Sequence, residues 1–171
     1  MGQDSLKGMG NISTADLVDA FVGRLRSCEI QFKNYGKLKR FCGPIRTIET
    51  LEDNLLIRRT LAEAGRNSVL VVGGGGSLRC ALLGDSLASL AQANGWAGII
   101  IWGAVRDVES LKNLEIGIRA LGTNPWKSGK AGTGMVDVAL DIAGFRLKPG
   151  EWLYSDEDGI VVSDGHLSIE T

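Results

Sequence analysis

The stretch from Val69 to Glu109, VLVVGGGGSLRCALLGDSLASLAQANGWAGIIIWGAVRDVE, decides the fold that we expect for this chain. An apolar run that ends at Val72 leads into four glycines, and a second apolar run spans Gly98 to Trp102. Continuous apolar runs bounded by turn residues are typical of strands that are buried on both faces of a parallel sheet. The segment between them has the apolar spacing of a helix, so the stretch predicts a strand–helix–strand unit.

Signals on both sides of this stretch continue the alternation of helices and strands. Helices are expected from Ser13 or Thr14 to about Phe21, from about Leu51 to Ala64, from Asp85 to about Asn94 and from Val108 to Leu114. Strands are expected from Gly43 to Glu49, Ser68 to Val72, Gly98 to Trp102 and Ile116 to Leu121, while Leu78 to Leu83 fits either type. This rhythm predicts an α/β fold built from parallel βαβ units.

The last third of the chain has a different composition. Residues 122–134, GTNPWKSGKAGTG, are rich in Gly, Lys and Ser and predict a long surface loop, a candidate lid or subunit contact. Met135 to Ile142 alternates as a half-buried strand does. Glu151 to Ser155 and Gly159 to Ser163 predict two short strands around a tight turn. An antiparallel element is therefore expected after the parallel one.

Length and composition are those of one globular domain. The 171 residues carry a formal net charge of −1, with 44% hydrophobic and 23% charged residues. This charge gives no bulk attraction for nucleic acid or for an acidic membrane. We expect residues 1–12 to be a flexible tail and residues 13–171 to form a single domain.

The cysteines and the N-terminus indicate a cytoplasmic protein. Cys28, Cys42 and Cys80 form no CxxC pair, and His166 is the only histidine, so a zinc site is not expected. The N-terminus lacks the apolar core of a signal peptide, and no apolar run reaches membrane-spanning length.

The four glycines suggest a nucleotide-binding loop, but the flanking residues fit that reading poorly. No Gly-Lys-Ser or Gly-Lys-Thr follows them, which excludes the Walker pattern. The next expected strand ends in glycine at Gly103, where a dinucleotide fold would place an acidic residue for the ribose. The alternative is that the glycines let two backbone segments approach closely beside a pocket.

Two charged motifs offer more specific chemistry. Gly84-Asp85-Ser86-Leu87 predicts a helix start, with Asp85 as the N-cap, and free N–H groups there bind carboxylate or phosphate. Arg106 and Asp107 follow the second strand, where open α/β sheets place ligands. Arginine binds carboxylate or enolate oxygens, and aspartate is a hard ligand for Mg²⁺ or Mn²⁺. The alternative is a helix cap and a surface ion pair.

Longer stretches of the chain resemble a known family. The run from Gly73 to Leu111, then IGIRALGTNPWKS and the closing PGEWLYSDEDGIVV, are similar to the regulator of ribonuclease E activity A family. That family is related to the class II 4-hydroxy-4-methyl-2-oxoglutarate/4-carboxy-4-hydroxy-2-oxoadipate aldolases. The most specific element is the spacing D-x20-R-D, which Asp85, Arg106 and Asp107 meet.

The resemblance implies a fold, an assembly and a site. The fold would be a three-layer swivelling β/β/α domain similar to phosphohistidine domains, assembled as a homotrimer with sites between subunits. Gly84, Asp85, Ser86 and Leu87 would bind substrate, Arg106 would bind substrate and act in catalysis with Asp85, and Asp107 would hold the metal. Larger aldolases use a further acidic residue from extra C-terminal chain, which we expect this sequence, ending at Thr171, to lack.

The resemblance also implies a function. The first hypothesis is a divalent-metal-dependent lyase that cleaves 4-hydroxy-4-methyl-2-oxoglutarate to pyruvate and decarboxylates oxaloacetate through a pyruvate enolate. The second is a protein-binding inhibitor of ribonuclease E or related RNA-processing machinery, with Trp126, Lys127 and Lys130 as contacts. A third, methyl transfer at the glycine loop, is disfavoured because no acidic residue follows the expected second strand.

Overall fold

The computed structural model describes residues 12–169, and its centre is a parallel sheet. The parallel strands are β3 (Phe41–Glu49), β4 (Val69–Gly73), β6 (Gly98–Val105) and β7 (Gly117–Thr123), with the short β5 (Ala81–Leu83) beside the end of β6. β2 (Lys33–Asn34) pairs antiparallel with β7, and β8 (Met135–Val136) pairs antiparallel with β3. The apolar runs of the sequence therefore form the middle of the sheet, as predicted.

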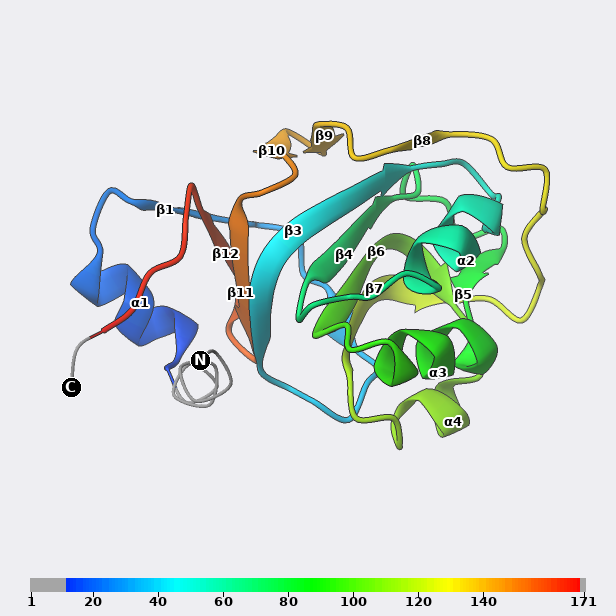
Figure 1. The fold of residues 1–171 in the computed structure, drawn as a ribbon, viewed down its shortest axis with the longest axis horizontal. Helices are drawn as coiled ribbons and strands as arrows, with labels where there is room; N and C mark the ends of the chain where they lie inside the picture. Colours follow the sequence, from blue (N-terminus) through cyan, green and yellow to red (C-terminus); the bar gives the residue numbers. More distant parts are fainter. Residues whose placement is uncertain (1–11, 170–171) are drawn as a thin grey trace.

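Helices cover one face of this sheet, and further strands cover the other (Figure 1). The helices are α2 (Leu55–Leu61), α3 (Asp85–Ala93) and α4 (Val108–Leu111). The further strands are β1 (Leu25–Ser27), β11 (Trp152–Asp156) and β12 (Gly159–Ser163), with the hairpin β9 (Leu140–Ile142) and β10 (Phe145–Leu147). The α/β class and its layered arrangement are confirmed.

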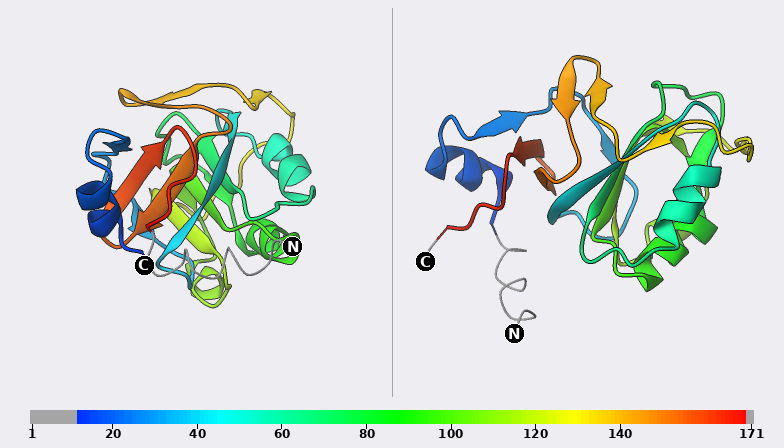
Figure 2. Two further views of the ribbon diagram at one scale, coloured as in Figure 1. Left: turned by 60° about the vertical axis from the view of Figure 1, so that its left-hand side comes forward. Right: turned by 45° about the horizontal axis from the view of Figure 1, so that its top comes forward.

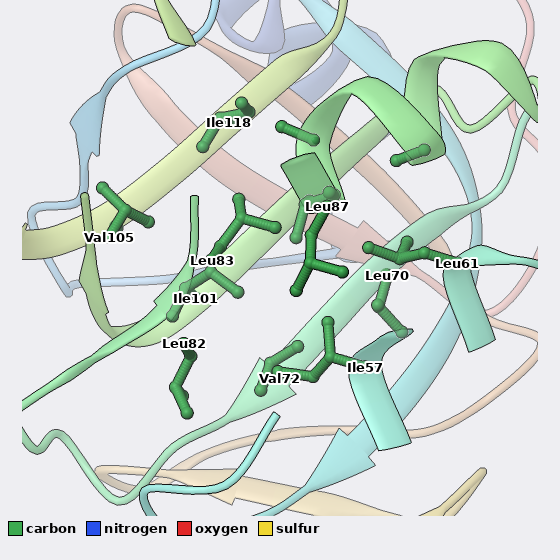
Figure 3. Close-up of a cluster of buried hydrophobic side chains, with 14 of the residues drawn as sticks. Ile57, Leu61, Leu70, Val72, Leu82, Leu83, Leu87, Ile101, Val105 and Ile118 are labelled. Atoms are coloured by element: carbon green, nitrogen blue, oxygen red, sulfur yellow. The ribbon is translucent and has the colours of Figure 1, made fainter. Parts of the chain in front are cut away.

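A first apolar core fills the space between the sheet and the helices. Figure 3 shows side chains of α2, α3 and strands of the sheet meeting there, among them Ile57, Leu70, Leu87 and Ile101. Each of these four side chains is at most 3% exposed. Burying them provides most of the free energy that holds the helices on the sheet, since a buried Leu or Ile contributes about 1.5–3 kcal/mol.

A second apolar core joins the parallel sheet to the antiparallel layer. Ile45, Val71 and Ile100 pack there against Leu153 and Val162 from the other layer. The long strand β3 belongs to both layers, because it pairs with β4 on one side and with β11 on the other. Figure 2 shows β11 and β12 on the opposite side of the sheet from the helices. Helix α1 (Thr14–Ala20) packs outside this layer, where Leu17 meets Tyr154 and Val161.

The predicted cap of the first helix is confirmed, and several predicted boundaries were wrong. Ser13 caps α1, since its hydroxyl accepts the N–H of Asp16 at 3.0 Å. The predicted helix from Leu51 to Ala64 begins only at Leu55, because Glu52 has a φ of +55° and the carboxylate of Asp53 caps the N–H of Leu55.

Two further differences concern strands. The expected strand from Met135 to Ile142 is interrupted, because Asp137 adopts a φ of +56° and separates β8 from β9. The strand predicted from Gly98 to Trp102 is longer in the structure, where it is β6 and ends at Val105. Of the predicted tail, residues 1–11 lie outside the described part of the chain. Ile12 packs against the apolar cluster that contains Leu17 and Tyr154.

Phe41 gives the fold a testable close contact. Its ring lies on Gly117, where an added Cβ would be 2.0 Å from a ring carbon. We expect Gly117→Ala to lower the free energy of unfolding by about 1–3 kcal/mol or more, as overpacking of a core does. Urea denaturation measures this change. Gly165→Ala is the control, because no atom lies within 4 Å of its added Cβ, and equal stability of the two variants would contradict the packing.

Candidate functional site

A cavity at the carboxyl-end edge of the parallel sheet collects the residues predicted from the sequence. It lies where β5 and β6 end and where α2 and α3 begin. Its lining comprises Asn54, Arg58, Ala81, Gly84, Asp85, Ser86, Leu87, Arg106, Asp107, Lys127, Ser128 and Lys130. All six predicted site residues are therefore brought together in one place.

Asp107 connects the end of β6 to the start of α3. Its backbone has a φ of +61°, a left-handed conformation that aspartate tolerates better than most residues. Its carboxylate Oδ2 accepts the backbone N–H of Asp85 at 3.0 Å. A Cβ on Gly84 would lie 2.6 Å from that oxygen, so only glycine gives the carboxylate this room.

Hydrogen bonds hold both the backbone and the side chain of Arg106. Its backbone N–H donates to the carbonyl of Leu83 at 2.9 Å, which joins the end of β6 to β5. Its guanidinium Nη1 donates to the carbonyl of Pro125 at 3.3 Å. The side chain is half-buried and lines the cavity, so its remaining donors can reach an anion there.

The prediction that Asp85 is the N-cap of α3 is wrong. The cap is Gly84, in an extended conformation, and Asp85 is the first helical residue with an exposed side chain. The carboxylate of Asp107 supplies the capping bond that a side chain at the cap position would otherwise make. The N–H groups of Ser86 and Leu87 belong to the first turn, which has no intrahelical acceptors, so they suit an anion in the cavity.

The Gly- and Lys-rich loop forms a second wall of the cavity. We call Pro125 to Gly132 the strap; it follows the right-hand edge of the molecule in Figure 1. The N–H of Ala81 donates to the carbonyl of Trp126 at 2.8 Å. Gly129 exchanges two bonds with the segment before α2: its N–H donates to Glu52 at 2.8 Å and its carbonyl accepts from Asn54 at 3.0 Å. The strap is thus anchored along its length.

Asp53 is the main anchor of the strap. Its side chain is 4% exposed, and its carboxylate accepts the N–H groups of Leu55, Ala131 and Gly132. Burial by itself would raise the pKa of this carboxyl, but the three backbone donors outweigh it and hold the pKa of Asp53 below its usual value. The ionised carboxylate therefore stabilises this conformation of the strap.

Sequence reasoning missed three polar residues of the cavity, Asn54, Arg58 and Ser128. Asn54 and Arg58 were placed inside a helix that was expected to begin at Leu51. The consecutive Asp53 and Asn54, both residue types that favour helix starts, were a signal for the true boundary. Ser128 had no local signal, because only the fold brings the strap to this wall.

The carboxylates of the cavity fit a hard divalent cation. Asp85 and Asp107 both line it, and Mg²⁺ is commonly held by one or two carboxylates together with water and substrate oxygens. Within residues 12–169, no group of three or more His, Cys, Asp or Glu side chains gathers as a closed metal site would require. The donor set therefore suits Mg²⁺ or Mn²⁺ better than structural zinc.

The glycine loop has a packing role beside this site. A Cβ on Gly74 would lie 2.6 Å from Leu82 and 2.8 Å from the carbonyl of Trp102. β6 runs to Val105, and the acidic residue Asp107 follows it closely. The sequence had predicted no acidic residue after this strand. Its carboxylate faces the start of α3, however, so it is engaged away from the glycine loop.

Other expectations concern the thiols and membranes. Cys28, Cys42 and Cys80 are free cysteines. His166 is exposed, with its ring 4.6 Å from that of Trp152. In the part of the chain that is described, none of the helices is long and apolar enough to span a membrane.

Comparisons with known proteins agree with this arrangement. A family model described as RraA-like, Aldolase/RraA, matches residues 14–162. A protein of Alkalilimnicola ehrlichii, provisionally named a 4-hydroxy-4-methyl-2-oxoglutarate aldolase, is 48% identical over 92% of this chain and 98% of its own length.

Two solved structures are similar over nearly the whole chain, each with a TM-score of 0.89. One is named S-adenosylmethionine: 2-dimethylmenaquinone methyltransferase of Geobacillus kaustophilus, with 46% identity over 91% of this chain and 97% of its own. The other is the RNA-processing inhibitor RraA of Thermus thermophilus, with 44% identity over 92% of this chain and 95% of its own.

The anchoring of the strap by Asp53 predicts a pH dependence. Because the pKa of Asp53 is lower in the folded chain than the unfolded value of about 4, its stabilisation is present above that pH and is lost as the pH falls through the folded pKa. At pH 7 we expect Asp53→Asn to lower the free energy of unfolding by about 1–3 kcal/mol.

Urea denaturation from pH 7 to pH 3 measures this effect, and the gap to wild type should narrow as the pH falls. Exposed Asp19 in α1 provides the control, Asp19→Asn, for which no gap is expected at pH 7. If the difference in unfolding free energy between wild type and Asp53→Asn is the same at pH 7 and pH 3, the stabilising role of the ionised Asp53 carboxylate is contradicted.

Proposed function

Because the chain belongs to the RraA-like family, Aldolase/RraA, we propose that it is a divalent-metal-dependent lyase that acts on small 2-oxo acids. The family match confirms the resemblance indicated by the sequence. The proposed reactions are cleavage of 4-hydroxy-4-methyl-2-oxoglutarate to pyruvate and decarboxylation of oxaloacetate, both through a pyruvate enolate. One observation carries the proposal: Arg106, Asp107 and the N-terminus of α3 line the same cavity.

The 2-oxo acid end of the substrate is assigned to the start of α3 and to Arg106. The N–H groups of Ser86 and Leu87 suit the carboxylate at C1, supported by the partial positive charge of the helix N-terminus. When the C3–C4 bond breaks, its electron pair moves to C3 and charge develops on the C2 oxygen. The guanidinium of Arg106 stabilises that charge where it develops.

Asp107 is assigned to the divalent metal, Mg²⁺ or Mn²⁺. Its Oδ2 is held by the N–H of Asp85, so the orientation of the carboxylate is fixed before any ligand binds. When bound, the metal supplies Lewis-acid polarisation of the C2 carbonyl. Gly84 belongs to this assignment, because a side chain there would displace the carboxylate.

Asp85 is assigned to proton transfer through a water molecule. Its exposed carboxylate lines the cavity, and it can orient a water that takes the proton of the C4 hydroxyl and returns one to C3 of the enolate. Decarboxylation of oxaloacetate needs no base for a hydroxyl group. Aldol cleavage therefore depends on Asp85 at least as strongly as decarboxylation does.

We extend the proposal to a cytoplasmic homotrimer with the cavity near a subunit contact. The support is the family and the exposed apolar side chains in the strap and beside the residue that precedes it. Trp126 in the strap is 72% exposed, and Leu78, whose carbonyl accepts the side chain of Asn124, is 47% exposed. Large exposed apolar side chains often mark contacts with other subunits.

The lyase assignment predicts a large effect at Asp107. We expect wild-type protein with Mg²⁺ to release pyruvate from oxaloacetate, and Asp107→Ala to lower kcat/KM by about 100-fold, since a lost metal carboxylate removes both binding and polarisation. Pyruvate is followed with lactate dehydrogenase. Glu109→Ala is the control, because this nearby carboxylate on α4 points to solvent. Equal rates of pyruvate release for wild type and Asp107→Ala would contradict the proposal.

A second candidate function is inhibition of an RNA-processing ribonuclease by direct binding. The observation that favours it is the likeness to the Thermus protein, which is named an RNA-processing inhibitor. Trp126 and Lys127 are exposed on the strap and offer an aromatic and a cationic contact. A surface of this kind suits an acidic or mixed protein segment.

This candidate predicts binding that depends on the strap. We expect the chain to retain the C-terminal region of ribonuclease E at micromolar concentration, and Trp126→Ala to weaken retention by at least about tenfold, as loss of an aromatic anchor does. A pull-down followed by calorimetry measures it. Val22→Ala changes another highly exposed apolar side chain, far along the chain, and serves as control. Absence of retention by wild type would remove this candidate.

A further inference from the structure

The cavity has a feature that the proposed chemistry at Arg106 and Asp107 does not use. Ser128 lies in the middle of the strap and is only 6% exposed. Ser128 is one of the residues that line the cavity, and its buried hydroxyl makes no hydrogen bond among the residues that the structure describes. Burying a hydroxyl without a partner is unfavourable, so a group that enters the cavity is the natural partner.

The backbone on each side of Ser128 is fixed in position. Lys127 forms a β-bridge with Ala81, and Gly129 forms one with Asp53. The same Asp53 holds Ala131 and Gly132 through its carboxylate. The position of Ser128 at the wall of the cavity is therefore set by a fixed backbone, and Asp53 is a positioning residue for Ser128.

The charges around the cavity indicate what that partner is. Among the described residues, four cationic side chains line it, Arg58, Arg106, Lys127 and Lys130, against two carboxylates, Asp85 and Asp107. One of these cations, Arg106, is assigned to the 2-oxo acid end. The other three lie on α2 and on the strap, the side of the cavity to which Ser128 belongs. A second negative group on the ligand would suit this side.

We infer that Ser128, held by the strap, donates a hydrogen bond to a second carboxylate of the substrate and so selects dicarboxylic over monocarboxylic 2-oxo acids. The inference rests on the proposed function, because it takes a 2-oxo acid at Arg106 as the other end of the ligand. Hydrogen bonds to a charged acceptor are stronger than those between neutral groups. The hydroxyl and the neighbouring cations together form the binding site for this group.

A matched pair of unreactive ligands tests the inference. 2-Oxoglutarate and 2-oxopentanoate have the same chain, and only the first has a carboxylate at the far end. Calorimetric titration in the presence of Mg²⁺ should show that wild type prefers 2-oxoglutarate by at least about tenfold. Ser128→Ala should weaken the binding of 2-oxoglutarate by about tenfold, which is the effect of losing one hydrogen bond to a charged group. Binding of 2-oxopentanoate should stay within about twofold.

Two controls separate this role from a structural one. Ser89→Ala removes an exposed serine of α3 that lies outside the cavity and should change neither affinity. Asp53→Asn should lower the preference in the same direction as Ser128→Ala, because it loosens the strap. Equal weakening of both ligands by Ser128→Ala, or no weakening of either, would overturn the inference.

The outcome also separates this inference from the lyase proposal. If wild type releases pyruvate from oxaloacetate but Ser128→Ala keeps the full preference for 2-oxoglutarate, only the role of Ser128 is wrong. If wild type neither turns over oxaloacetate nor binds either 2-oxo acid, the proposed function fails, and the role of Ser128 fails with it. In oxaloacetate turnover, Ser128→Ala should raise KM by about tenfold while kcat changes less than threefold.

Discussion

The hydrogen bond from the backbone N–H of Asp85 to the carboxylate of Asp107, at 3.0 Å, is the constraint on which the candidate site depends. It joins the end of a central strand to the start of a helix and fixes the orientation of the carboxylate. It requires a residue without a side chain at Gly84 and a left-handed backbone at Asp107. The carboxylate of Asp107, which follows β6, makes the capping hydrogen bond of α3. The side chain of Asp85 therefore stays available to the cavity.

A second constraint acts from the opposite wall. The buried carboxylate of Asp53 gathers three backbone N–H groups, two of them from residues 78 and 79 positions further along the chain. A Gly-rich segment would lose much conformational freedom on ordering, and the charge-assisted bonds offset that loss. The two constraints together hold polar groups of α2, α3, β6 and the strap around one small volume. Such preorganisation favours binding and charge stabilisation without rearrangement.

The fold could be predicted well where residues carry a local pattern. The apolar runs at Val69 and Gly98 became central parallel strands, and Ser13 capped its helix as expected. The predictions failed where one residue's backbone angle decided the outcome, at Glu52 before α2 and at Asp137 between β8 and β9. Positive φ values outside glycine have only a weak signature in sequence, because the surrounding contacts impose them.

The sequence by itself determined the class of fold and one side of the candidate site. The spacing of Asp85, Arg106 and Asp107 indicated a shared location, since the ends of neighbouring parallel strands and the helix starts that follow them lie at one edge. Only the tertiary structure decided the other side, where Asn54, Arg58 and Ser128 meet the same cavity. These residues come from segments far apart in the chain, and hydrogen bonds such as those of Asp53 bring them together. Periodicity reports which face of an element is buried, but it carries no information about which distant loop covers it.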